Sequence, residues 1–134
     1  MGSSKVNEHG LPIGQSLREG YEISCREARQ RTGEPGFVIV DVRLESELQV
    51  ARVEGAIHIP LHEIEQRADE IPAGAKVATL CHHGVRSLKA ALALRAMGWA
   101  DCVSIAGGIE AWSLSADPNV PRYERNGPIC RIVT

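Results

Sequence analysis

One cysteine of the chain lies in a setting suited to nucleophilic chemistry. Cys81 follows an apolar, β-branched run at 76–80 and opens the segment Cys81-His82-His83-Gly84-Val85-Arg86-Ser87, which joins a predicted strand to a predicted helix. Such a junction turns successive backbone N–H groups inward and adds the positive end of the helix dipole. This field favours a thiolate, which is the nucleophilic form of cysteine. The segment therefore predicts that Cys81 is catalytic.

The six residues after Cys81 form the predicted substrate-binding loop. Gly84 permits the backbone conformation that a ring of inward-facing amides requires. Arg86, together with His82 and His83, is expected to draw an anionic substrate to the mouth of the loop. The full predicted set is His82, His83, Gly84, Val85, Arg86 and Ser87.

Two other chemistries are less well matched by these residues. A Cys-dependent phosphatase or arsenate reductase places five residues between Cys and Arg, whereas four separate Cys81 from Arg86, and the narrower loop suits a single sulfur atom. A zinc site needs about four converging ligands, usually in paired spacings. Cys81, His82 and His83 are adjacent and no second pair exists, so we expect no metal.

The other three cysteines are predicted to be structural or incidental. Cys25 falls on an amphipathic helix and Cys102 falls in a strand, where a cysteine usually acts as a small buried hydrophobe. Cys130 lies in the C-terminal tail, and a role in accepting or resolving sulfur is the weaker interpretation.

The elements that must position Cys81 alternate along the chain. Helical patterns are predicted at 25–31, 44–52, 61–71, 87–97 and from Gly107-Gly108 to about 115, and Ser24 is the expected N-cap of the first. Strands are predicted at 37–43, 56–60, 76–80 and 102–105. Strands that alternate with helices indicate an α/β fold, a parallel sheet with helices on both faces. Ligands of such folds bind at the carboxyl ends of the strands, where Cys81 stands.

The composition of the chain and the order of its segments exclude some classes of binding partner. We divide the chain into a loose lead-in at 1–19, one domain at 20–116 and a tail at 117–134 that lacks periodicity. The net charge of −2, from 15 basic and 17 acidic residues, argues against nucleic acid. No apolar run approaches the roughly 20 residues that span a bilayer, and no secretory signal pattern opens the chain. We therefore expect a cytoplasmic protein without a membrane partner.

Four short motifs together resemble a known family. They are Val40-Asp41-Val42-Arg43, the stretch from Gly55 to Pro60, the Cys81–Ser87 loop, and the stretch from Gly107 to Trp112. In this order, over roughly 21–122, the chain is similar to a single-domain rhodanese of the thiosulfate sulfurtransferase family. The resemblance implies a five-stranded, mainly parallel sheet and a catalytic cysteine that opens the loop. It also suggests that Asp41 and Arg43 support the loop.

The resemblance and the loop together predict a sulfurtransferase. Cys81 would take a sulfane sulfur from a donor such as thiosulfate and hold it as a persulfide. It would then pass the sulfur to a thiol, cyanide or a sulfur-accepting protein, with no cofactor. The alternative from another class is a non-catalytic binding module on the same fold.

Overall fold

The chain folds around a five-stranded parallel sheet. The computed structural model describes residues 5–133. The strands lie in the order β1 (Glu22–Ile23), β5 (Val103–Ile105), β4 (Lys76–Leu80), β2 (Phe37–Asp41) and β3 (Ile57–His58). All four pairings between neighbouring strands are parallel. The predicted α/β class and the five-stranded sheet are confirmed.

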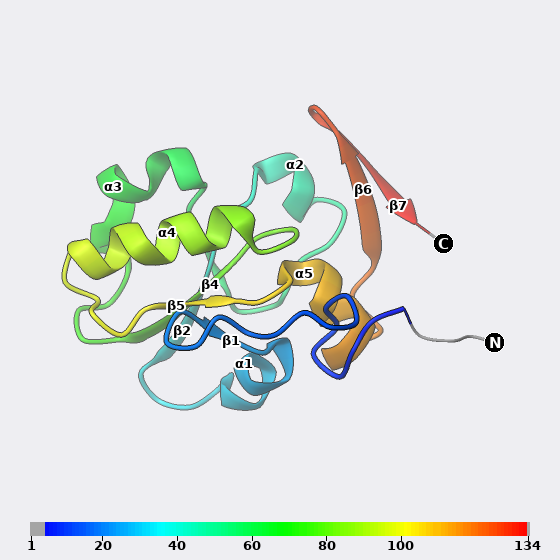
Figure 1. The fold of residues 1–134 in the computed structure, drawn as a ribbon. Coiled ribbons are helices and arrows are strands. Elements are labelled where there is room, and N and C mark those ends of the chain that lie inside the picture. Colours follow the sequence, from blue (N-terminus) through cyan, green and yellow to red (C-terminus); the bar gives the residue numbers. More distant parts are fainter. Residues whose placement is uncertain (1–4, 134) are drawn as a thin grey trace.

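Helices cover both faces of the sheet (Figure 1). One face packs against α1 (Cys25–Arg31) and α5 (Gly108–Ala111), which a π-helical turn at Trp112–Ala116 extends. The other face packs against α4 (Val85–Ala96) and α3 (Ile64–Arg67), which lies between the 3-10 turns Leu61–Glu63 and Ala68–Glu70. A short helix, α2 (Glu45–Leu48), follows β2. None of the helices in residues 5–133 is both long and apolar enough to cross a membrane.

The alternation of side chains along β2 explains its apolar sequence. Ile39 lies in the core cluster on the α1 side, whereas its neighbour Val40 lies in the cluster on the α4 side. A strand buried on both faces needs apolar residues at consecutive positions, as the sequence predicts. The predicted cap of α1 is also confirmed, because the Ser24 side chain accepts a hydrogen bond from the backbone N–H of Glu27 at 3.0 Å.

The helix after the loop begins earlier than predicted. It starts at Val85 rather than Ser87, because Gly84 ends the loop with φ of +103°, a backbone conformation that glycine adopts without strain. Arg86 and Ser87 therefore belong to the first turn of α4. Their side chains have fixed directions, since they are part of a helix and not of a loose loop.

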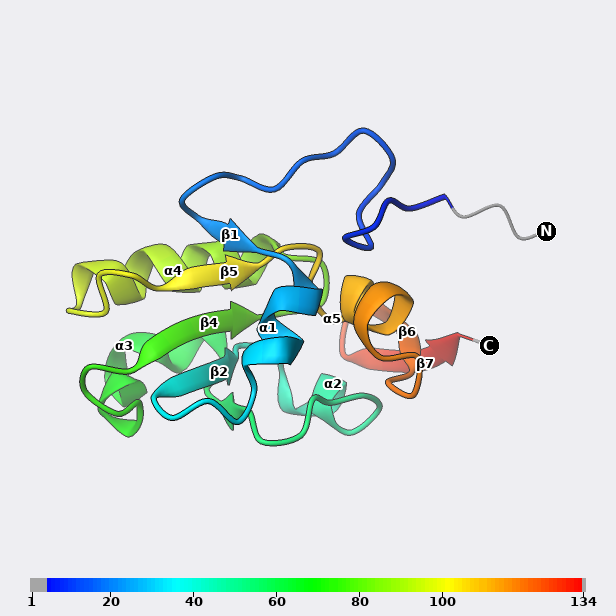
Figure 2. The same cartoon turned by 90° about the horizontal axis from the view of Figure 1, so that it is seen from below.

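Two segments whose sequences lack hydrophobic periodicity are held in place by tertiary contacts. Within the predicted lead-in, of which residues 1–4 lie outside the described part of the chain, Leu11 is buried in the core on the α1 side. The predicted tail is not irregular, because β6 (Arg122–Asn126) and β7 (Ile129–Val133) form an antiparallel hairpin. The hairpin stands at the side of the domain toward which the parallel strands point (Figures 1 and 2).

Candidate active site

Cys81 lies directly after β4, at the carboxyl end of the sheet, as predicted. It is only 1% exposed, yet it is among the residues that line a pocket open to solvent. The backbone N–H of Gly84 donates a hydrogen bond to its Sγ at 3.0 Å. This bond and the N-terminus of α4 both place positive charge beside the sulfur, so they stabilise a negative charge there.

Two buried serine hydroxyls form a chain of hydrogen bonds that starts at the Cys81 sulfur. The Cys81 thiol donates to Ser87 Oγ at 3.3 Å, and Ser87 Oγ is 2.7 Å from Ser104 Oγ on β5. When the thiol loses its proton, the Ser87 hydroxyl can rotate to donate to the sulfur while it accepts from Ser104. Ser87, a predicted substrate-binding residue, is fully buried and supports the nucleophile from behind.

The amino end of α5 sets the orientation of the loop. The backbone N–H groups of Ile109 and Glu110 donate to the carbonyl oxygens of Cys81 and His82 at 2.8 and 3.1 Å. These bonds turn the two carbonyls toward α5. Gly108 makes the close approach possible, because a Cβ at this position would lie 2.5 Å from the carbonyl oxygen of His82. This contact accounts for the Gly107-Gly108 motif.

Arg86 is held by a buried carboxylate. Its guanidinium donates two hydrogen bonds to Glu47, at 2.6 and 2.9 Å, and Glu47 is 0% exposed. The hydroxyl of Tyr123 donates to the same carboxylate at 2.5 Å, and so does the backbone N–H of Leu44 at 3.1 Å. Arg86 was predicted to draw an anionic substrate to the mouth of the loop; Glu47 compensates much of its charge, and its role toward a substrate stays a prediction.

Glu47 stays ionised in this environment. Burial alone would raise its pKa, but the hydrogen bonds from Arg86, Tyr123 and Leu44 lower it to about 2. The same ion pair raises the pKa of Arg86, against the effect of burial, and the electrostatic interaction with Cys81 adds to the increase. The arrangement fixes the guanidinium close to the nucleophile.

Asp41 and Arg43 form a buried ion pair that supports Glu47 and Tyr123. The guanidinium of Arg43 bonds to Asp41 at 2.9 and 2.7 Å, and it donates to the hydroxyl of Tyr123 at 3.2 Å. Burial opposes the charge of Arg43, but Asp41 raises its pKa overall. These contacts connect β2 through Tyr123 and Glu47 to Arg86. Asp41 and Arg43 therefore reach the loop indirectly, and their supporting role stays a prediction.

His82 contributes a neutral ring, so it adds no positive charge to attract the anionic substrate that it was predicted to bind. Its Nε2 is 3.0 Å from the carbonyl oxygen of Tyr123, and the two rings stack with centroids 3.9 Å apart. Burial lowers the pKa of His82 to about 4, and the nearby His83 adds to this effect, while the Tyr123 carbonyl opposes it. His82 is therefore uncharged near neutral pH and joins the loop to the hairpin.

The lowered pKa of His82 predicts a loss of stability in mild acid. The unfolded chain takes up a proton near the ordinary value of about 6.5, whereas the folded chain does so near 4. The free energy of unfolding should thus fall as the pH drops from about 7 to 5, by up to about 2 kcal/mol from this group. Urea unfolding at both pH values measures it. His82→Gln, which retains a donor for the Tyr123 carbonyl, should show a smaller decrease, and an equal decrease in both proteins would contradict the assignment.

The loop and the hairpin enclose a pocket of about 870 Å³. From the predicted site it is lined by Cys81, His82, His83, Val85 and Arg86. Gly84 and Ser87 do not line it, since they bond to the sulfur from inside. The other lining residues are Glu110 and eight hairpin residues: Arg122, Tyr123, Glu124, Arg125, Asn126, Ile129, Arg131 and Val133.

Three features of the site were not predicted from the sequence: Glu47, Tyr123 and the hairpin. Glu47 looks like one of several charged residues in a surface helix, and nothing local indicates its burial. The hairpin did have a signal, because Gly127-Pro128 is a dipeptide that often marks a turn. The strands pair from Arg122 and Val133 to Asn126 and Ile129, so Gly127 and Pro128 form the two-residue turn between them.

Comparisons with known proteins agree with this geometry. Residues 24–115 match the family model of the Rhodanese-like domain. The chain is 32% identical over 100 residues to a protein named Sulfurtransferase from Allochromatium vinosum, and the match covers 74% of this chain and 94% of that protein. It is 30% identical over 129 residues to Adenylyltransferase and sulfurtransferase MOCS3-1 of Zea mays, with 90% of this chain covered.

The relatives differ greatly in length. The matched region spans 27% of MOCS3-1, 24% of MOCS3-2 from the same plant, and 58% of a Bacillus subtilis relative. Among solved structures, a Rhodanese-like domain protein from Staphylococcus aureus aligns with a TM-score of 0.65 and 28% identity, over 75% of this chain and 95% of that one. The family match ends at residue 115, before the hairpin begins.

Proposed function

Because the chain belongs to the rhodanese-like sulfurtransferase family, we propose that it moves a sulfane sulfur from an anionic donor such as thiosulfate to a thiophilic acceptor through a persulfide on Cys81. One observation carries this proposal. Cys81 lines the pocket, and its sulfur accepts a hydrogen bond from the Gly84 backbone at 3.0 Å, so a negative charge on sulfur is stabilised beside a space that a substrate can enter.

The first half-reaction loads the enzyme. The Cys81 thiolate attacks the outer sulfur of thiosulfate, a new S–S bond forms, and the old S–S bond breaks with its electron pair leaving on sulfite. The charges balance, because a thiolate and a dianion give a persulfide anion and sulfite dianion. The terminal sulfur then lies one S–S bond from Sγ, within the pocket that Cys81 lines.

The second half-reaction returns the enzyme to its starting state. An acceptor thiolate attacks the terminal sulfur, and Cys81 leaves as the thiolate while the acceptor becomes a persulfide. The other acceptors in our proposal are cyanide and a thiol of a partner protein. The pocket of about 870 Å³ lies near the upper end of the volumes of small-molecule sites. This volume supports an acceptor larger than cyanide. Two separate half-reactions should give ping-pong kinetics.

The persulfide itself is the most direct test. The protein is incubated with thiosulfate, digested and analysed by mass spectrometry. We expect an increase of about 32 Da on the peptide that contains Cys81, and we expect cyanide to remove it. Incubation with sulfate, which has no sulfane sulfur, is the control and should add nothing. An unmodified Cys81 peptide, or a stable increase on Cys130 alone, would contradict the proposal and favour a non-catalytic module.

A further inference from the structure

The hairpin contributes three arginines to the wall of the pocket. Arg122, Arg125 and Arg131 all line it, and all three follow residue 115, where the family match ends. Arg86 from α4 is the fourth lining arginine. An anionic substrate would be attracted most strongly by an arginine that is not paired with a carboxylate of its own.

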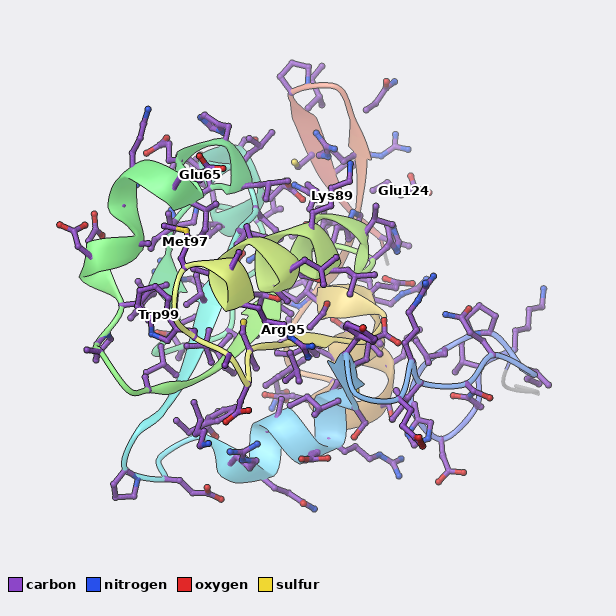
Figure 3. The ribbon with its side chains drawn as sticks, turned by 60° about the vertical axis from the view of Figure 1, so that its left-hand side comes forward. Glu65, Lys89, Arg95, Met97, Trp99 and Glu124 are labelled. Carbon is purple, nitrogen blue, oxygen red and sulfur yellow. The ribbon has the colours of Figure 1, made fainter. Side chains whose placement is uncertain are left out.

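Two of the hairpin arginines are individually neutralised. Arg122 bonds to Glu110 at 2.6 Å, and Arg131 pairs with Glu124 at 3.0 Å. Glu124, labelled on the hairpin in Figure 3, is itself exposed. Each of these pairs contributes no net charge to the pocket.

Arg125 is in a different position, because it shares its nearest carboxylate with Arg86. Its Nε is 3.9 Å from Glu47 Oε1, a distance too long for a hydrogen bond. The Glu47 oxygens already accept hydrogen bonds from Arg86, Tyr123 and Leu44. Glu47 can therefore compensate only one of the two guanidiniums beside it, and Arg125 has no carboxylate of its own among the described residues.

Arg125 is also placed to use this charge on a ligand. Its side chain is 33% exposed, more than the 22% of Arg86, and it is directed into the same pocket as Cys81. The hydrogen bond that it donates within the hairpin, to the carbonyl of Gly127, is long at 3.4 Å. Most of its N–H donors thus remain available to an incoming anion.

We propose that Arg125 is the residue that binds the anionic group of the sulfur donor, so that the hairpin supplies the positive charge for a substrate attacked by Cys81. This inference rests on the proposed function for the identity of the donor. A guanidinium suits the oxygens of a sulfonate-like group, because its fork of N–H donors matches two oxygens at once. Arg86, held by Glu47, positions the loop, and Arg125 selects the charge of the ligand.

Alkylation of Cys81 tests the charge selection without requiring sulfur transfer. Iodoacetate carries a carboxylate and iodoacetamide is its neutral counterpart, so the ratio of their rates at Cys81 measures attraction of an anion. At low salt, Arg125→Gln should lower this ratio about fivefold, since the local attraction is lost, and high salt should reduce the difference. Arg125→Lys should keep at least half of the wild-type ratio. In the transfer assay, Arg125→Gln should raise KM for thiosulfate with kcat nearly unchanged.

Arg52→Gln is the matched control, because Arg52 is exposed, lies outside this pocket and carries the same charge. An unchanged ratio in Arg125→Gln, an equal loss in Arg125→Lys, or an equal loss in Arg52→Gln would each overturn the proposal. The alkylation readout is independent of persulfide formation. A chain that forms no persulfide but selects iodoacetate through Arg125 would refute the proposed reaction alone, whereas normal sulfur transfer with no charge selection would refute the role of Arg125 alone.

Discussion

Cys81→Ser is expected to lower the rate of sulfur transfer from thiosulfate by about three orders of magnitude or more. A hydroxyl cannot form the persulfide, so both half-reactions lose their intermediate. The fold should persist, because serine is of similar size and its oxygen can accept from the Gly84 amide as sulfur does. Steady-state assays with cyanide as acceptor, together with thermal unfolding of the same sample, separate lost chemistry from lost structure.

Cys130→Ser is the control for this prediction. Cys130 lies in β7 and is partly buried, and its replacement should leave the transfer rate within about twofold of wild type. The two remaining cysteines are poor substitutes for Cys81, because burial raises the pKa of Cys25 and raises that of Cys102 to about 12. Appreciable transfer by Cys81→Ser that disappears on further mutation of Cys130 would show that the nucleophile was wrongly assigned.

Asp41→Ala is expected to have the largest effect on stability. Arg43 is 0% exposed, and Asp41 is the carboxylate that bonds to its guanidinium, at 2.7 and 2.9 Å. Removal of one member of a buried ion pair leaves an uncompensated charge and costs about 3–5 kcal/mol. In a domain of this size, such a loss should lower Tm by about 10 °C or more. Calorimetry or circular dichroism measures it.

An exposed ion pair provides the comparison. Lys76 and Asp101 are 2.8 Å apart, a similar distance, but their side chains are 60% and 73% exposed, so Asp101→Ala should lower the free energy of unfolding far less than Asp41→Ala does. Arg43→Met in the Asp41→Ala background should restore part of the lost stability, because it removes the unpaired charge. Equal costs for the two alanine variants would mean that burial does not determine the strength of the Asp41–Arg43 pair.

The sequence alone determined the features that depend on residues close to one another along the chain. The apolar run at 37–40 and the run at 76–80 predicted buried parallel strands, and both lie in the central sheet. The position of Cys81 at the end of a strand followed from the same pattern, because a catalytic loop after a parallel strand opens at the carboxyl edge of the sheet. The cap of α1 at Ser24 needed only its neighbours for its prediction.

Tertiary structure decided which charges meet at the site. Arg86 and Glu47 are 39 positions apart in the chain, and Tyr123 follows Glu47 by 76. No spacing rule relates residues on α2, α4 and a C-terminal hairpin, so their meeting depends on how these elements pack. The burial of Glu47, the neutral state of His82 and the sharing of Glu47 between Arg86 and Arg125 all result from that packing. Local periodicity identified the nucleophile, whereas the electrostatic environment of the pocket arises from contacts between distant segments.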